Sequence, residues 1–112
     1  MSHETTTPHV IVEQQGTVLR VAFNRPEKKN ALTHAMYTAV ADAIDRVESD
    51  PGLRVLFLTG TADCFTSGND MVDFMQNPPS GGGSPVMRFL NGIRSMTKPL
   101  VAAVNGPAVG VG

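Results

Sequence analysis

The strongest constraint on the fold is a glycine-rich segment, residues 105–112, that follows an apolar stretch, residues 99–104. Three glycines within its last seven residues mark backbone that turns tightly or approaches another group closely. A second glycine-bearing turn, residues 65–70, follows another apolar stretch, residues 53–59. Backbone N–H groups in such turns can point at a developing negative charge, as in an oxyanion hole. Two apolar strands that each end in such a turn predict one anion-stabilising site.

Composition indicates one globular domain or a piece of a larger one, because the chain has 112 residues and 41% hydrophobic content. A formal net charge of −1 predicts no nucleic-acid or anionic-membrane partner. The single cysteine cannot form an internal disulfide. No apolar run approaches the roughly 20 residues that span a bilayer, and the polar N-terminus lacks a signal-peptide core. We therefore expect a cytoplasmic protein.

The N-terminal third reads as a lead-in followed by a β-hairpin. Residues 1–8 are polar and are expected to be disordered. Residues 10–12 and 18–23 are rich in β-branched side chains and flank a turn at Gly16, which predicts two antiparallel strands. Pro26 should end the second strand, and residues 27–30 should form a polar loop.

A helix and a strand are predicted next. Thr33 is a plausible N-cap for a helix that runs to about Ser49, with its apolar residues at helical spacing and Pro51 and Gly52 beyond its end. The mostly apolar residues 53–59 are typical of a strand that is covered on both faces. A strand, a helix and a strand in this order predict a right-handed crossover.

The C-terminal part contains two further helices and a last strand. Residues 71–76 and 86–96 are predicted to be helical, and residues 99–104 form a strand that looks buried from its composition. Between the helices, residues 77–85 have the proline, glycine and serine content of a flexible linker.

Each glycine-rich turn also has a plain structural interpretation. Gly68 could aim the Asn69 amide into a cleft while Asp70 caps the following helix, but an ordinary strand-to-helix junction has the same residues. The glycines at 106, 110 and 112 do not follow the G-x-G-x-x-G order of a dinucleotide-binding loop.

Few side chains are candidate catalysts. His34 is expected to be solvated in the first turn of the long helix, and Cys64 to be a small buried residue rather than a nucleophile. Asp63 and Asp73 are expected to face solvent. No spacing of histidine, cysteine and carboxylate indicates a metal site. The loop lysines 28 and 29 could meet a phosphate or simply be solvated.

Taken together, five segments in order resemble the enoyl-CoA hydratase/isomerase family, also called the crotonase superfamily. They are the N-terminal hairpin, residues 24–32 (NRPEKKNAL), the helix with the strand VLFLTG, residues 64–70 (CFTSGND), and residues 98–110 (KPLVAAVNGPAVG). The sequences of the last two segments most resemble the Δ3,Δ2-enoyl-CoA isomerase branch. The resemblance covers the chain beyond residue 9 and implies an α/β fold: the N-terminal part of a crotonase-like ββα spiral, incomplete in this chain.

The resemblance also implies a site. By position, the backbone amides of Asn69 and Val111 correspond to the two donors that hold the thioester oxygen of an acyl-CoA and stabilise its enolate. Residues that would contact the substrate lie around the first loop and both turns: Lys28, Asn30, Ala31, Leu32, Thr66, Ser67, Gly68, Asp70 and Gly110. Where relatives often carry a glycine triplet, this chain has Gly110-Val111-Gly112, which keeps an amide donor.

The implied function is enoyl-CoA isomerisation or hydration in fatty acid metabolism. Coenzyme A would enter as part of the substrate, with no separate cofactor and no metal. The acid/base carboxylates, the later core elements and the contacts of a homotrimer or dimer of trimers would lie beyond residue 112. The alternatives are a non-catalytic acyl-CoA-binding or assembly module on the same fold, and an inactive fragment of the enzyme.

Overall fold

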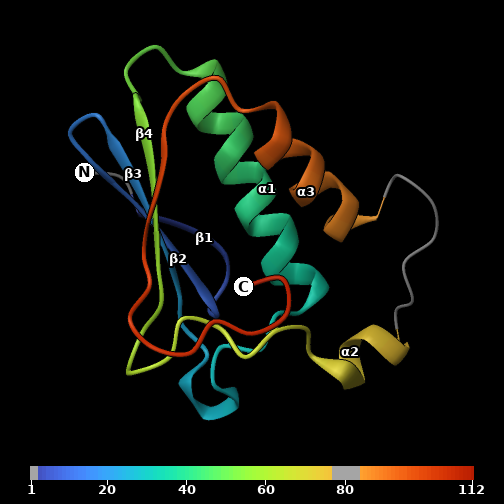
Figure 1. The fold of residues 1–112 in the computed structure, drawn as a ribbon. Helices are drawn as coiled ribbons and strands as arrows, with labels where there is room; N and C mark the ends of the chain where they lie inside the picture. Colours follow the sequence, from blue (N-terminus) through green and yellow to red (C-terminus); the bar gives the residue numbers. More distant parts are fainter. Residues whose placement is uncertain (1–2, 77–83) are drawn as a thin grey trace.

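The computed structural model describes residues 3–76 and 84–112 (Figure 1). Its centre is a mixed sheet with the strand order β1-β2-β3-β4-β5. The first three strands are antiparallel, whereas β4 runs parallel to β3 and β5 runs parallel to β4. The strands are β1 (His3–Thr7), β2 (Val10–Gln15), β3 (Val18–Phe23), β4 (Val55–Thr59) and β5 (Leu100–Ala103). The predicted α/β class is confirmed.

The predicted hairpin is confirmed as β2 and β3, whose register closes at the pair Gln15–Val18. Gly16 in the turn has φ +62°, a left-handed conformation that costs glycine little. The strand β3 ends at Phe23, before Pro26, as predicted. The loop that follows contains a short 3-10 helix, Pro26–Lys28, rather than irregular backbone alone.

The N-terminal lead-in differs from the prediction. His3–Thr7 form the strand β1, which pairs antiparallel with β2 around an irregular register between residues 4 and 7. The expectation of disorder is wrong for these five residues. The outer edge of β2 offers unpaired backbone N–H and C=O groups, and a preceding segment rich in threonine has a high preference for extended backbone.

The long helix α1 (His34–Ser49) is confirmed with both predicted ends. The Thr33 side chain accepts a hydrogen bond from the Met36 N–H at 3.2 Å and caps the first turn. The apolar face predicted from helical spacing is buried in the core: Met36, Val40, Ala43, Ile44 and Val47. This face lies against the sheet, so α1 is the crossover between the parallel strands β3 and β4.

The two apolar strands are less enclosed than the sequence predicts. In β4, Leu56 and Leu58 are buried towards α1, while Val55 and Phe57 on the opposite face are only partly covered. In β5 the expectation of burial is wrong, because Val101 is 48% exposed. The cause is position in the sheet: β5 is an edge strand, and among the described residues no helix packs on the face that carries Val101.

Two further helices follow the parallel part of the sheet. The predicted helix α2 (Met71–Gln76) is confirmed, and α3 (Pro85–Ser95) begins one residue earlier than expected, with the Ser84 side chain as its N-cap. Most of the predicted linker, residues 77–83, lies outside the described residues. The helices α1 and α3 lie side by side on one face of the sheet (Figure 1). No described helix is long and apolar enough to cross a membrane.

Candidate functional site

Three loops meet at the carboxyl end of the parallel strands, at the same end of the sheet in Figure 1. They follow β3, β4 and β5 and comprise residues 24–33, 60–70 and 104–112. Backbone hydrogen bonds join them: the Ser67 N–H donates to the Lys29 carbonyl at 3.0 Å. This end of an open α/β sheet is where ligands commonly bind.

Asn30 holds the first two loops together from inside. Its side chain is fully buried, accepts from the Arg25 N–H at 2.7 Å, and donates to the Cys64 carbonyl at 2.8 Å. Thr66 is also fully buried, and its hydroxyl donates to the Asn30 carbonyl at 2.7 Å. Both side chains, which the resemblance places at the substrate, are therefore committed to the loops themselves.

Residues 66–70, here called the first turn, present one of the two predicted amides. Gly68 has φ +98° and is buried, and its carbonyl accepts from the Leu32 N–H at 2.7 Å. The Asp70 N–H donates back to the Leu32 carbonyl at 2.8 Å. These two hydrogen bonds form an isolated backbone bridge between Leu32 and the first turn, and they leave the Asn69 N–H pointing away from Leu32. Within residues 3–76 and 84–112, the Asn69 N–H donates to no group.

Asp70 locks the end of the first turn. Its carboxylate accepts from the Asp73 N–H at 2.9 Å, which confirms the predicted cap of α2, and from the Arg25 guanidinium at 2.6 Å. Only about an eighth of each ion-paired side chain is exposed: 14% for Arg25 and 13% for Asp70. The Asp73 N–H, and then the Arg25 guanidinium, lower the pKa of Asp70.

Residues 109–112, here called the second turn, present the other predicted amide. Gly110 has φ +63°, and the Gly112 N–H closes the turn on the Val109 carbonyl at 3.1 Å. Among the described residues, nothing accepts a hydrogen bond from the Val111 N–H. The Val111 side chain is 41% exposed.

The two turns touch each other through their glycines. A Cβ atom added to Gly68 would lie 3.2 Å from the Val109 carbonyl oxygen, and one added to Gly110 would lie 3.8 Å from the Gly68 Cα. Backbone pairing continues the contact, since the Val109 N–H donates to the Thr66 carbonyl at 3.0 Å. The fold thus brings together the two amides that the sequence places 42 residues apart, at positions 69 and 111.

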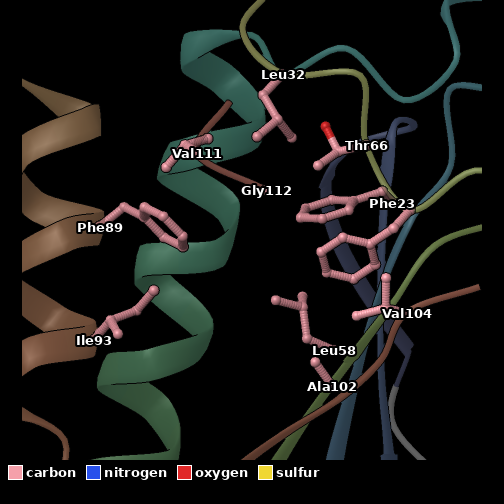
Figure 2. Close-up of a pocket in the computed structure, with 11 residues that line it drawn as sticks. Phe23, Leu32, Leu58, Thr66, Phe89, Ile93, Ala102, Val104, Val111 and Gly112 are labelled. Atoms are coloured by element: carbon pink, nitrogen blue, oxygen red, sulfur yellow. The ribbon is translucent and has the colours of Figure 1, made fainter. Parts of the chain in front are cut away.

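An apolar cavity of about 190 Å³ lies behind the second turn. Figure 2 shows Phe89 and Ile93 of α3 on one side of it, Phe23 and Leu58 of the sheet on the other, and Val111 near its upper end. The remaining lining residues are Leu32, Phe65, Thr66, Ala102, Val104 and Gly112. None of the lining residues ionises, so the cavity offers shape but no acid or base.

Comparison with known proteins decides the family. The sequence model of the enoyl-CoA hydratase/isomerase family matches residues 13–112. The chain belongs to this family.

Among its relatives, enoyl-CoA hydratase EchA19 of Mycobacterium tuberculosis (strain ATCC 25618 / H37Rv) is 41% identical over 94% of this chain and 42% of its own length. Enoyl-CoA delta isomerase 2 of Rattus norvegicus is 37% identical over 91% of this chain and 27% of its own length. The solved structure of Pseudomonas aeruginosa OdaA superposes with a TM-score of 0.89 at 46% identity, over 94% of this chain and 42% of that one. The chain therefore spans less than half the length of these relatives and has the fold of an N-terminal portion of them.

Other predicted contact residues of this family member lie at the rim of the site. Lys28 is exposed and, with Arg25 and Asp70, lines a polar hollow of about 290 Å³. Ser67 donates its hydroxyl to the Lys28 carbonyl at 3.3 Å. Ala31 is half-buried next to Leu32. Lys28 and Ala31 thus belong to the loop that is hydrogen-bonded to the first turn, of which Ser67 is a part.

Two expectations about titratable side chains are wrong. His34 is not freely solvated: it is 18% exposed, and its ring meets the edge of Phe74 at a centroid distance of 5.8 Å. Asp73 does not simply face solvent, since its carboxylate accepts from the His34 N–H at 2.8 Å. In both cases α2 folds back over the start of α1. Cys64 is buried, as predicted.

Sequence reasoning missed two residues that hold the site. Arg25 carries no local signal of its role, but it pairs with Asp70 across 45 residues of sequence. Tyr37 lies on the apolar face of α1, and its hydroxyl donates to the Asn69 side chain. The only available signal for Tyr37 was its helical spacing from Val40, which indicates burial but not a partner. Among the described residues, no three His, Cys, Asp or Glu side chains gather in a way that could hold a metal ion.

Proposed function

We propose that the natural gene product that carries this chain binds an acyl-CoA thioester and stabilises its enolate with the backbone amides of Asn69 and Val111. One observation carries the proposal: two N–H groups that have no acceptor among the described residues lie on two contacting turns of a family member. When a proton leaves the carbon next to a thioester, negative charge develops on the carbonyl oxygen. Fixed amide dipoles that already point there stabilise this charge without reorganising.

The reaction proposed is enoyl-CoA isomerisation or hydration. The names of two relatives, an enoyl-CoA hydratase and an enoyl-CoA delta isomerase, support this range of chemistry. The carboxylate nearest the amides in sequence, Asp70, is paired with Arg25 and has a lowered pKa, so it stays charged and suits a structural role. The proton is therefore proposed to move through a carboxylate on the C-terminal side of Gly112.

Contacts to the coenzyme A part of the substrate are proposed for the rim of the first turn. Lys28 and Lys29 are both exposed there, and ammonium groups at such a place can pair with phosphate oxygens. Ala31 is half-buried beside them and is proposed to border the rest of the carrier through its side chain, since its backbone N–H and carbonyl are already hydrogen-bonded to Lys28 and Arg25.

The test removes one amide. Val111→Pro in the natural gene product deletes the proposed donor, while Val111→Ala keeps it and serves as the matched control. Loss of one oxyanion donor costs about 3–4 kcal/mol of transition-state stabilisation, so turnover of a 2-enoyl-CoA or a 3-enoyl-CoA should fall roughly 100- to 1,000-fold. Val111→Ala should lose far less.

Folding is the necessary control, because proline also restricts the second turn. Circular dichroism and the melting temperature should show that the proline variant is folded. Replacing Val111 by its α-hydroxy acid is a milder second test, since an ester keeps the side chain and removes only the N–H. A folded Val111→Pro protein with close to the parent turnover would contradict the oxyanion assignment. If the parent protein binds an acyl-CoA but does not turn over either substrate, a non-catalytic binding module is favoured.

A further inference from the structure

Tyr37 is a buried side chain whose polar hydroxyl the proposed chemistry leaves unused. It lies in the first half of α1, is 2% exposed, and packs its ring against Phe89 of α3 at a centroid distance of 5.3 Å. Its hydroxyl donates a hydrogen bond to the Asn69 Oδ1. The core of the protein is thus connected through one polar contact to the residue whose backbone amide is the proposed oxyanion donor.

The Asn69 N–H belongs to the peptide group whose Gly68 carbonyl accepts from Leu32, so the bridge holds one end of that group and the Tyr37 contact holds the residue at its other end. The direction of the Asn69 N–H depends on the backbone torsions of Gly68, which has φ +98° and no side chain to restrict it. The bridge to Leu32 restrains each of the two peptide groups beside Asn69 at one atom, the Gly68 carbonyl and the Asp70 N–H, and makes no bond to the Asn69 N–H or carbonyl. A hydrogen bond to the side chain holds the Asn69 Cα itself.

We propose that Tyr37 is a positioning residue, whose hydroxyl holds the Asn69 side chain and thereby keeps the Asn69 N–H aimed at the developing oxyanion. The proposal rests on the function proposed above. Burial raises the pKa of Tyr37 to about 12, so the phenol remains a donor across the pH range in which such an enzyme works. A purely structural role is the competing explanation, because a buried tyrosine hydroxyl usually finds some partner.

The experiment is a double-mutant cycle in the natural gene product. Tyr37→Phe removes the hydroxyl and keeps the ring, and Asn69→Ala removes the acceptor and keeps the backbone amide. Each should lower kcat by roughly three- to tenfold, the effect of one hydrogen bond, with little change in KM. A contact expressed mainly in the transition state lowers kcat rather than substrate binding. The double variant should be no slower than the slower single variant.

A packing control separates positioning from stability. Phe89→Leu removes the ring that packs against Tyr37 but leaves the Tyr37 hydroxyl in place. It should lower the melting temperature at least as much as Tyr37→Phe does, yet reduce kcat less. If kcat instead follows the melting temperature across these variants, Tyr37 is structural and the proposal is overturned.

The outcomes also distinguish this proposal from the function on which it rests. Parent-like kcat in Tyr37→Phe, together with the loss expected for Val111→Pro, overturns the role of Tyr37 and leaves the oxyanion assignment intact. If the two single-variant losses in kcat multiply in the double variant, the positioning role of Tyr37 is also overturned, because the two residues would then act independently. A folded and active Val111→Pro protein would remove the oxyanion assignment first, and the positioning role with it.

Discussion

The two turns of the candidate site are held in opposite ways. The first turn is buried or half-buried and is cross-linked by side chains: Thr66 is fully buried, and the Asp70 carboxylate is paired with Arg25. The second turn is exposed, with Val109 and Val111 53% and 41% accessible, and it is held to the first turn by backbone bonds. The first turn is therefore held by the side chains of Thr66 and Asp70, whereas the second turn lies close to its neighbours because its glycines have no side chains.

This difference determines which substitutions each turn tolerates. The first turn should be sensitive to the loss of polar groups, because each of its buried bonds has a specific partner. The second turn should be sensitive to the gain of atoms, because glycines allow its backbone to lie against the β4 loop. A Cβ atom on Gly112 would lie only 2.2 Å from the Thr66 Cγ2, for example.

The largest effect is expected where a side chain is added beside the second turn. Gly106 has φ +147°, and a Cβ atom there would lie 2.0 Å from the Asp63 carbonyl oxygen, so Gly106→Ala must displace backbone. We expect a loss of about 2–5 kcal/mol in the free energy of unfolding, from strain and overpacking together. Gly16→Ala is the matched control. Gly16 has φ +62° with open space around its Cβ position, so only about 1–2 kcal/mol should be lost.

Urea unfolding of both variants in the natural gene product measures the difference. If Gly106→Ala and Gly16→Ala lower the free energy of unfolding equally, the positive φ of each glycine accounts for the whole loss. The close approach to the β4 loop would then not be what holds the second turn in place.

The next largest effect is expected from the ion pair of the first turn. Asp70→Asn keeps a cap for α2 but removes the charge that faces Arg25, and should lower the free energy of unfolding by about 1.5–3 kcal/mol. Asp45→Asn is the matched control, because Asp45 pairs with Arg88 at the same distance of 2.6 Å but is 68% exposed. Exposed pairs of this kind contribute about 0–1 kcal/mol.

Similar losses in the two variants would contradict the importance of burial at the first turn. A loss of turnover in Asp70→Asn without a loss of stability would instead indicate that Asp70 acts directly on the substrate.

Local features of this fold were predictable from sequence. Thr33 and the apolar spacing of α1 mark the helix, and Gly16 marks the hairpin, because caps, periods and turns act over a few residues. The glycines of both turns were also visible. Because each turn follows an apolar strand, the sequence predicts one anion-stabilising site, but it does not predict the contact between the glycines of the two turns.

What could not be predicted depends on distant or absent neighbours. The partners Arg25 and Asp70 are 45 residues apart, and Asn30 looks like an ordinary loop residue although it is fully buried. No local pattern encodes such pairings. The exposure of Val101 was missed for the opposite reason: an apolar composition describes what a strand can bury, whereas its position in the sheet decides what covers it.

The smallest effect is expected in the pH dependence of stability. Hydrogen bonds from the Asp73 N–H and from Arg25 lower the pKa of Asp70 in the folded state. The folded protein therefore binds fewer protons than the unfolded chain, whose aspartates titrate near about pH 3.9. The stabilisation is complete above that pH and is lost as pH falls through the lowered pKa of the folded state.

Urea unfolding between pH 6 and pH 2.5 tests this sign. The free energy of unfolding of the parent should fall with acidification below about pH 4, and Asp70→Asn should show a shallower fall. The slope should not vanish, because the Thr97 N–H also lowers the pKa of Glu48 at the other end of the sheet. Glu48→Gln is therefore the comparison. Glu48→Gln, and not Asp70→Asn, could instead reduce the fall of the free energy of unfolding below about pH 4. In that case, stability in acid depends on the junction between α1 and β5, and the first turn is held by its uncharged hydrogen bonds.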